Sequence, residues 1–353
     1  MEDILCNISA WRYHRTPPQI RALCPQLPPL EADKNRIGLK TSPLVQESIG
    51  LPVHLMVAQR ERLSCNPAVR RHLKLGELPP GSIWETEHGI NVTSPLMTVF
   101  SFAETLSSTE LTMMLYEVCG TFSVYRPTAK MTALLRQAYR DGIFQEGDGW
   151  KWVQSAEGSE SSLWRRPPLA RIDELRSFCD AMNGHRGIVK FKRAARDVFG
   201  VCASPFEVQT AMLLGLSRRR GGEGFCRLAT NERISLTRVA SRIAGQNTAY
   251  ADIVLRSRDG SHEIILECQS RQIHARYGAG IADAKRATAL QSMGYPVVMI
   301  TSEQLFDEEQ FEQIVKTACD LLGERYREKT SHSEAAQHRL RRELFINWET
   351  LGE

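Results

Sequence analysis

The stretch Tyr250-Ala-Asp-Ile-Val-Leu-Arg-Ser-Arg-Asp-Gly-Ser-His-Glu-Ile-Ile-Leu-Glu-Cys-Gln269 decides the fold of the C-terminal half of this chain. Two β-rich runs flank Asp259-Gly260, and an Asp-Gly pair between such runs predicts a two-residue hairpin turn. In the register set by this turn, Asp252 falls directly opposite Glu267, and Gln269 lies two residues further along on the same face. The stretch therefore predicts an antiparallel hairpin with two opposed carboxylates.

These opposed carboxylates need a compensating charge. Side chains opposite each other in an antiparallel pair have Cβ atoms about 5 Å apart, so two carboxylates there repel. The neighbouring residues 253–255 and 264–266 are all apolar, which indicates central strands covered on both faces. The sequence places no cation nearby, and a hard divalent cation such as Mg²⁺ suits carboxylates with a backbone carbonyl. The alternative is that both carboxylates lie solvated at strand ends, and the pairing itself depends on the Asp259-Gly260 turn.

Sequence patterns outside the hairpin predict further helices and strands. In the C-terminal half we expect helices over 172–183, 188–199, from Ser204-Pro205 onward, 282–293 and 305–325, and strands near 233–239 and 296–301. In the N-terminal half we expect strands over 52–58 and 89–93, helices after Ser94-Pro95, from Ser108 and over 128–141, and a hairpin or linker over 147–162. Residues 1–50 are rich in proline and predict an irregular arm.

These elements predict an α/β protein. A mixed, mostly helical domain over 1–170, with a regulatory or partner-binding role, precedes a core of a mixed central sheet flanked by helices over 171–328. A polar C-terminal helix or tail follows over 329–353.

Composition and charge narrow the class of protein. The 353 residues are 42% hydrophobic and 24% charged, which is ordinary for a globular chain of two or three domains. No apolar run approaches 18 residues and no signal peptide is evident, and the nine cysteines are scattered without a CxxC motif. We therefore expect a cytoplasmic protein that does not enter a membrane. Between residues 186 and 242, twelve Lys or Arg face four acids, an excess of +8 in a chain of net charge +4. Such a stretch suits a polyanion, although a solvated charge run is the alternative.

The Asp, hairpin, Glu-x-Gln order resembles the PD-(D/E)XK nuclease superfamily, and residues 204–327 resemble its very-short-patch-repair-endonuclease-like branch. The region after Thr93-Ser94-Pro95 is similar to the one that precedes this domain in abortive-infection antitoxin-like bacterial proteins. The pieces that carry the nuclease resemblance follow one another in order. They are Ser204-Pro205-Phe-Glu207, Tyr250-Ala-Asp252, Glu267-Cys-Gln269, His274, Asp283-Ala-Lys285-Arg286, Leu290, Gly294-Tyr295 and Val297-Val298.

The resemblance implies a site for Mg²⁺ or Mn²⁺, with Asp252, Glu267 and the Cys268 carbonyl as ligands. A bound metal would polarise the scissile phosphate and lower the pKa of the attacking water. Glu207 would be the acidic residue of the first core helix, although Ser204-x-x-Glu207 also reads as a capping box. His274 would be an acid or base, or else a surface histidine.

Gln269 departs from this pattern, because it stands where the superfamily usually has Lys and where this branch often has another acid. Glutamine orients water but cannot act as a general base.

The resemblance also implies contacts with DNA and other partners. Lys285 and Arg286 are candidate phosphate contacts, and a solvated helix face is the alternative for these two residues. A second group of candidates is Arg218, Arg219 and Arg220, which are expected to form a mobile basic loop. A homodimer, and a cognate toxin or defence partner, complete the expected partners.

Three functions follow from these expectations. The first is a metal-dependent endonuclease that hydrolyses DNA in bacterial defence or repair. The second is a DNA-binding or antitoxin-like regulator that keeps the nuclease fold without cutting, which Gln269 favours. The third is a protein whose basic stretch binds an acidic protein partner.

Overall fold

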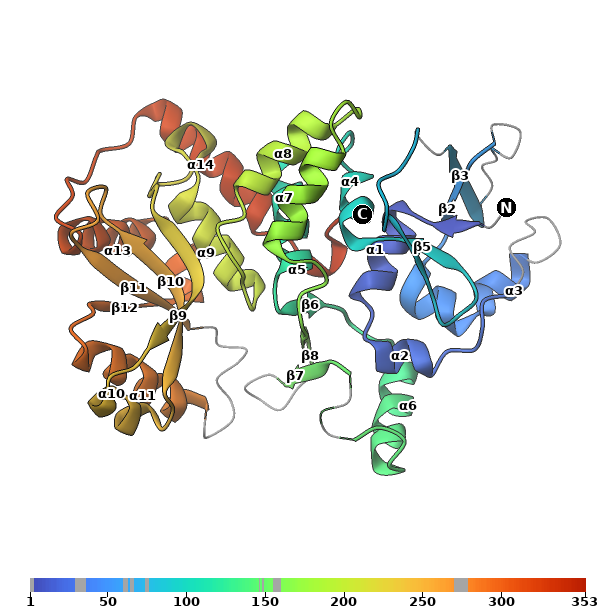
Figure 1. Ribbon diagram of the computed structural model, residues 1–353, viewed down its shortest axis with the longest axis horizontal. Helices are drawn as coiled ribbons and strands as arrows, with labels where there is room; N and C mark the ends of the chain where they lie inside the picture. The colour runs from blue at the N-terminus through green and yellow to red at the C-terminus, as the bar shows by residue number, and fades with distance from the viewer. Residues whose placement is uncertain are drawn as a thin grey trace. The chain divides into compact units, whose positions relative to one another are not determined.

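The computed structural model describes residues 3–28, 36–59, 63, 67–73, 76–145, 147, 149–154, 160–269 and 279–353. Helices and strands alternate along the chain (Figure 1), which confirms the predicted α/β class. The chain divides into two compact units. Unit 1 comprises Met1–Trp152, Ser162–Ala195 and Asn347–Glu353, and unit 2 comprises Val153–Ser161 and Arg196–Ile346.

Unit 1 contains a five-stranded mixed sheet in the order β3-β2-β1-β5-β4. Its strands are β1 (Ile4–Leu5), β2 (Val53–Val57), β3 (Val69–Leu73), β4 (Ile83–Glu85) and β5 (Asn91–Thr93). A three-stranded sheet has the order β6-β8-β7, with β6 (Phe122–Val124), β7 (Lys151–Gln154) and β8 (Glu160–Arg165). The helices are α1 (Asn7–Arg15), α2 (Pro18–Ala22), α3 (Arg36–Thr41), α4 (Pro95–Phe100), α5 (Ser108–Cys119), α6 (Ala129–Arg140), α7 (Ile172–Ala181) and α8 (Ile188–Arg196), with the π-helix η1 (Val45–Ile49) and the 3-10 turn η4 (Trp348–Thr350).

The described residues 3–28 and 36–50 do not form an irregular arm, so that prediction is wrong for them. They supply one strand and several helices, and Leu5, Ile20 and Leu44 are fully buried. Pro17 and Pro18 occupy the N-cap and first position of α2. Proline is favourable there because its fixed φ suits a helix start and its missing N–H has no partner to lose. The proline pair therefore begins a helix instead of interrupting one.

A buried ion pair joins α1 to α5 in unit 1. The Arg15 Nε atom lies 2.7 Å from Oε1 of Glu117, and neither side chain is more than 6% exposed. The same oxygen accepts hydrogen bonds from the Ser123 hydroxyl and the Val124 N–H. A second nitrogen of Arg15 donates to the carbonyl of Trp348 at 2.6 Å. One guanidinium thus joins α1, α5 and the C-terminal segment.

His14 in α1 makes the stability of unit 1 depend on pH. Its Nε2 atom lies 2.7 Å from the carbonyl oxygen of Thr93. Burial lowers the pKa of His14 to about 4, although the bond to Thr93 acts in the opposite direction. An unfolded histidine titrates near pH 6.5, so acid protonates the unfolded chain first and favours unfolding as the pH falls from about 6.5 toward 4.

We expect the free energy of unfolding of unit 1 to decline between pH 7 and pH 5, with His14 contributing about 2 kcal/mol of that decline. The variant His14→Gln keeps a side-chain donor for Thr93 and should show a decline smaller by this amount. Urea titrations followed by tryptophan fluorescence measure it, because all six tryptophans lie in unit 1. Equal declines in the two proteins would contradict the assignment.

Unit 2 is built on a four-stranded sheet in the order β12-β11-β10-β9. The strands are β9 (Leu228–Ser235), β10 (Thr248–Arg256), β11 (Glu263–Gln269) and β12 (Val297–Thr301). Both β9 and β11 run antiparallel to β10, whereas β12 runs parallel to β11. Residues 253–255 and 264–266 are buried, so β10 and β11 are covered on both faces as predicted.

Helices flank this sheet. They are α9 (Pro205–Gly215), α10 (Arg238–Ala244), α11 (Ala279–Ser292), α12 (Ser302–Phe306), α13 (Glu308–Leu321) and α14 (Ser331–Leu344), with the 3-10 turn η3 (Arg218–Arg220). Figure 1 shows α10 and α11 side by side below the strands and α13 above them. Leu290 of α11 packs with Val254 and Ile265 of the sheet.

Within residues 329–353, where a polar C-terminal helix or tail is predicted, the chain forms helix α14, and this helix packs closely on unit 2. Leu340 and Leu344 are buried, and the carbonyl of Leu344 accepts a hydrogen bond from the buried side chain of Gln209 in α9. Gly221 brings its backbone against that of Ala336, where an added Cβ atom would lie 2.4 Å from the carbonyl oxygen. Helix α14 therefore belongs to the core of unit 2.

Candidate active site

The central hairpin has the predicted register. Its ladder pairs Ile253 with Leu266 and continues to Arg256 opposite Glu263. Extended by one position, this register sets Asp252 opposite Glu267. The Asp252 Oδ2 atom accepts a hydrogen bond from the N–H of Cys268 at 2.7 Å. The side chain of Asp252 therefore reaches across to β11, at the end of the strand that carries Glu267.

The turn that sets this register differs from the predicted one. Ser257 N–H donates to the carbonyl of His262, so the loop contains the four residues 258–261 instead of two. Gly260 N–H donates to the carbonyl of Ser257, and Gly260 has a φ of +78°, a conformation that glycine adopts without strain. A four-residue loop centred on the same point leaves the same residues opposite one another. The predicted register is therefore confirmed although the predicted turn type is wrong.

Glu267 is buried against an arginine that sequence reasoning placed elsewhere. Its side chain is 2% exposed, and Oε2 accepts hydrogen bonds from Nε of Arg286 at 3.1 Å and from Nη2 at 2.6 Å. The expectation that no cation lies near the carboxylates is thus wrong, because α11 carries Arg286 back onto the sheet. In sequence the two residues are 19 positions apart, and no local pattern marks the pair.

Glu207 lies at the start of α9 and is also buried. Its N–H donates to the Ser204 hydroxyl, which in turn donates to Oε1 of Glu207 at 2.9 Å. Oε2 accepts a hydrogen bond from the N–H of Ala203 at 2.7 Å. Ser204 therefore caps α9 as considered, whereas the Glu207 carboxylate accepts from the N–H of Ala203, one residue before the N-cap. These bonds fix the orientation of the Glu207 carboxylate.

The thiols of the buried Cys202 and the half-buried Cys268 both feel the charges of Glu207 and Asp252. Burial raises the pKa of Cys268 well above the usual range, and the charges of Asp252 and Glu207 raise it further. The pKa of Cys202 is raised by burial and by the same two carboxylates. One carboxylate comes from α9 and the other from β10, so the structure brings both into one electrostatic cluster beside Cys268.

The remaining predicted residues occupy different surroundings. Gln269 is the last residue of β11, is half-buried and lies opposite Thr301 of β12. Lys285 is exposed on α11. His274 lies outside the described residues.

The arginines 218–220 do not form a mobile loop. They make the 3-10 turn η3, in which Arg218 donates to the backbone carbonyls of residues 327 and 328. Arg220 forms an ion pair with Asp197, whereas Arg219 is exposed. The turn that follows Arg220 holds these arginines in place, since Gly221 and Gly222 pack directly against the backbone of other segments. Two of the three guanidinium groups are therefore engaged within unit 2.

The oxygen atoms at the ends of β10 and β11 have the chemistry that Mg²⁺ prefers. They are the carboxylates of Asp252 and Glu267 and the carbonyl of Cys268. Over the described residues, no three His, Cys, Asp or Glu side chains form a group that could hold a metal ion. These oxygen atoms are thus suitable ligands for a hard cation. In the structure, however, the Glu267 carboxylate is hydrogen-bonded to Arg286.

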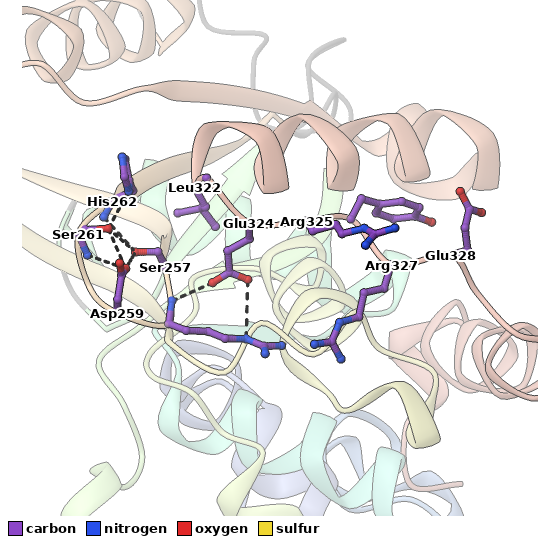
Figure 2. A pocket seen from close by; sticks show the side chains of 12 residues that line it. Ser257, Asp259, Ser261, His262, Leu322, Glu324, Arg325, Arg327 and Glu328 are labelled. Atoms are coloured by element: carbon purple, nitrogen blue, oxygen red, sulfur yellow. Dashed lines mark hydrogen bonds and ion pairs between the residues drawn. The ribbon is translucent and has the colours of Figure 1, made fainter.

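A separate pocket of about 770 Å³ lies at the turn of the same hairpin (Figure 2). Residues 257–262 line one side and 322–328 the other. Glu324 Oε1 accepts a hydrogen bond from the N–H of Arg258 at 2.8 Å, and Oε2 lies 3.8 Å from Nε of that residue. Arginine and acidic side chains are mixed here, so the pocket has no strong net charge. No local sequence pattern marks this pocket, because its two sides are at least sixty positions apart in the chain.

Comparisons with protein-family models, with curated proteins and with solved structures find no match to this chain. A helix that crosses a membrane would have to be longer and more apolar than any in the described part of the chain.

Proposed function

We propose that unit 2 is a metal-dependent endonuclease domain that hydrolyses DNA phosphodiesters in bacterial defence or repair. One observation carries the proposal: the central hairpin has the register that places Asp252 opposite Glu267, and α9 brings the buried Glu207 into the same cluster. Glu207 and Glu267 are buried, and Asp252 is half-buried. Buried acidic groups are costly to stability, and their gathering at one end of a sheet is typical of a functional site.

The residues of the chain have distinct roles in this proposal. Asp252, Glu267 and the Cys268 carbonyl would hold Mg²⁺ or Mn²⁺, which when bound polarises the phosphate and acidifies the attacking water. Glu207 adds negative charge beside Asp252, and its capping bonds hold that charge in place. Gln269 orients water by hydrogen bonds, and His274 is the proposed acid or base. Lys285 and Arg219 are exposed and are the proposed phosphate contacts.

The test is cleavage of supercoiled plasmid by the full chain with Mg²⁺, with Mn²⁺ and with EDTA. We expect nicking that requires the metal and that falls by about 100-fold or more in Asp252→Asn and in Glu267→Gln, because each variant removes a metal ligand. Retention of DNA on a gel should stay equal or increase, since negative charge is lost. Cleavage by either variant at the parent's rate would show that these residues are not the site.

Matched controls separate the loss of a ligand from the loss of a charge. Glu309 and Asp320 are exposed on α13 in the same unit. Glu309→Gln and Asp320→Asn remove the same charges as the two site variants. Both control proteins should cleave like the parent.

A second candidate is a DNA-binding or antitoxin-like regulator that does not cut. The ion pair between Arg286 and Glu267 favours it, because the guanidinium already neutralises one of the two proposed ligands. Gln269 favours it as well, since the chain lacks a Lys at that position. DNA retardation without metal-dependent nicking is the result this candidate predicts. A second copy of the chain and a toxin or defence protein are the proposed protein partners in either case.

A further inference from the structure

We propose that Arg286 competes with a divalent cation for the carboxylate of Glu267, so that metal can bind at full strength only after the guanidinium has moved away. This inference rests on the proposed function, because it concerns the same carboxylate. It assigns to Arg286 a role in metal affinity in place of the expected phosphate contact.

The contacts of Glu267 carry the argument. Both hydrogen bonds from Arg286 end on one oxygen, Oε2, at 3.1 and 2.6 Å. The carboxylate is 2% exposed, so these charge-assisted bonds act where water screens them little. A cation bound to the same carboxylate would lie within a few ångströms of the guanidinium. Two positive charges at that separation repel, and each therefore lowers the affinity of the other.

The structure also indicates which partner moves. Glu267 is held in the middle of a ladder, where it lies opposite Met299 of β12. The Arg286 side chain is 26% exposed and extends from helix α11, which packs on the sheet. A long arginine side chain can rotate toward solvent without any change in the backbone. Displacement of Arg286 is thus the cheaper rearrangement, and the strand can stay in place.

The experiment measures binding of Mn²⁺ alone to the full chain by electron paramagnetic resonance at a fixed ionic strength of 0.15 M. Arg286→Met removes the guanidinium and keeps an apolar stem. We expect this variant to bind Mn²⁺ about 10-fold or more tightly than the parent, which corresponds to the loss of a competing charge-assisted contact. Glu267→Gln should abolish the site in either background.

Arg339→Met is the matched control. Arg339 is exposed on α14 in the same unit and carries the same charge. Its removal should change the Mn²⁺ affinity by no more than about 2-fold, as expected for a screened surface charge. An equal gain in Arg339→Met and Arg286→Met would overturn the inference, because general repulsion would then explain both.

A further variant protects the test against misfolding. Arg286→Lys keeps the positive charge but loses the planar fork of donors, and we expect its Mn²⁺ affinity to lie between those of the parent and Arg286→Met. If the parent binds Mn²⁺ in a Glu267-dependent manner and the Arg286 variants bind it with unchanged affinity, the competition is refuted while the metal site of the proposed nuclease stands. If no protein in the series binds Mn²⁺, both proposals fall.

Discussion

Replacing Arg15 by Met is expected to lower the free energy of unfolding of unit 1 by about 3–5 kcal/mol. The substitution leaves the Glu117 carboxylate buried without its cation, 2.7 Å from where the Arg15 Nε atom had been. It also removes the donor to the carbonyl of Trp348. A buried charge that loses its partner cannot recover its solvation by a small shift of the backbone. The loss should therefore far exceed that of an ordinary surface ion pair.

The measurement is urea unfolding followed by tryptophan fluorescence, which reports unit 1 alone because unit 2 contains no tryptophan. Arg126→Met is the control, since Arg126 forms an ion pair with Glu349 in the same unit but is 56% exposed. Surface ion pairs contribute about 0–1 kcal/mol, so this control should unfold almost like the parent. Similar losses in both variants would refute the special role of the buried pair.

Replacing Gly222 by Ala is expected to destabilise unit 2 by about 3 kcal/mol, the upper range for forcing extra atoms into a packed site. An added Cβ atom would lie 2.1 Å from the carbonyl oxygen of Leu216 and 2.6 Å from its carbonyl carbon. Both are backbone atoms at the end of α9, so no side chain can rotate to make room. Leu216 and Gly222 are joined by the tight turn that contains η3.

Amide hydrogen exchange detects this loss. The central amides of β10 and β11 exchange through unfolding of unit 2, and they should exchange about 100-fold faster in the variant. Peptides from β2 in unit 1 serve as the internal reference. Gly245→Ala is the matched control, because Gly245 has a φ of +71° but no atom within 4 Å of the added Cβ. It should cost only about 1 kcal/mol from backbone strain. If the amides of β10 and β11 exchange at the same rate in Gly222→Ala and Gly245→Ala, the close contact with Leu216 is not the reason why position 222 requires glycine.

The sequence predicts the hairpin well because the information lies within twenty residues. Side-chain alternation and the Asp259-Gly260 turn fix which residues face each other, and neither depends on distant parts of the chain. Helix starts such as Ser94-Pro95 and Ser204-Pro205 were predictable for the same reason, since the capping hydrogen bond is local. The register that places Asp252 opposite Glu267 is therefore a local property.

The environment of Glu267 could not be predicted in this way. Whether Arg286 contacts a phosphate or a buried carboxylate depends on how α11 returns to the sheet, and helix periodicity does not specify that return. In residues 1–50, the local sequence signal led to a wrong prediction. Proline pairs in residues 1–50 indicated irregular structure, whereas burial of Leu5 and Ile20 supplies the free energy that holds short helices there. Tertiary contacts overrode the local signal in both cases.

The loop at the hairpin turn has a consequence for how this unit tolerates change in length. Four residues, 258–261, occupy the place where two were expected, and yet residues Ile253 to Arg256 of β10 keep their predicted neighbours on β11. Lengthening the loop by one residue on each side of the turn keeps the same residues opposite one another, whereas a single residue inserted within a strand would shift the register and turn its side chains to the other face. The tip can accordingly be lengthened or shortened in steps of two during evolution or engineering while the carboxylates at the far end keep their mutual alignment.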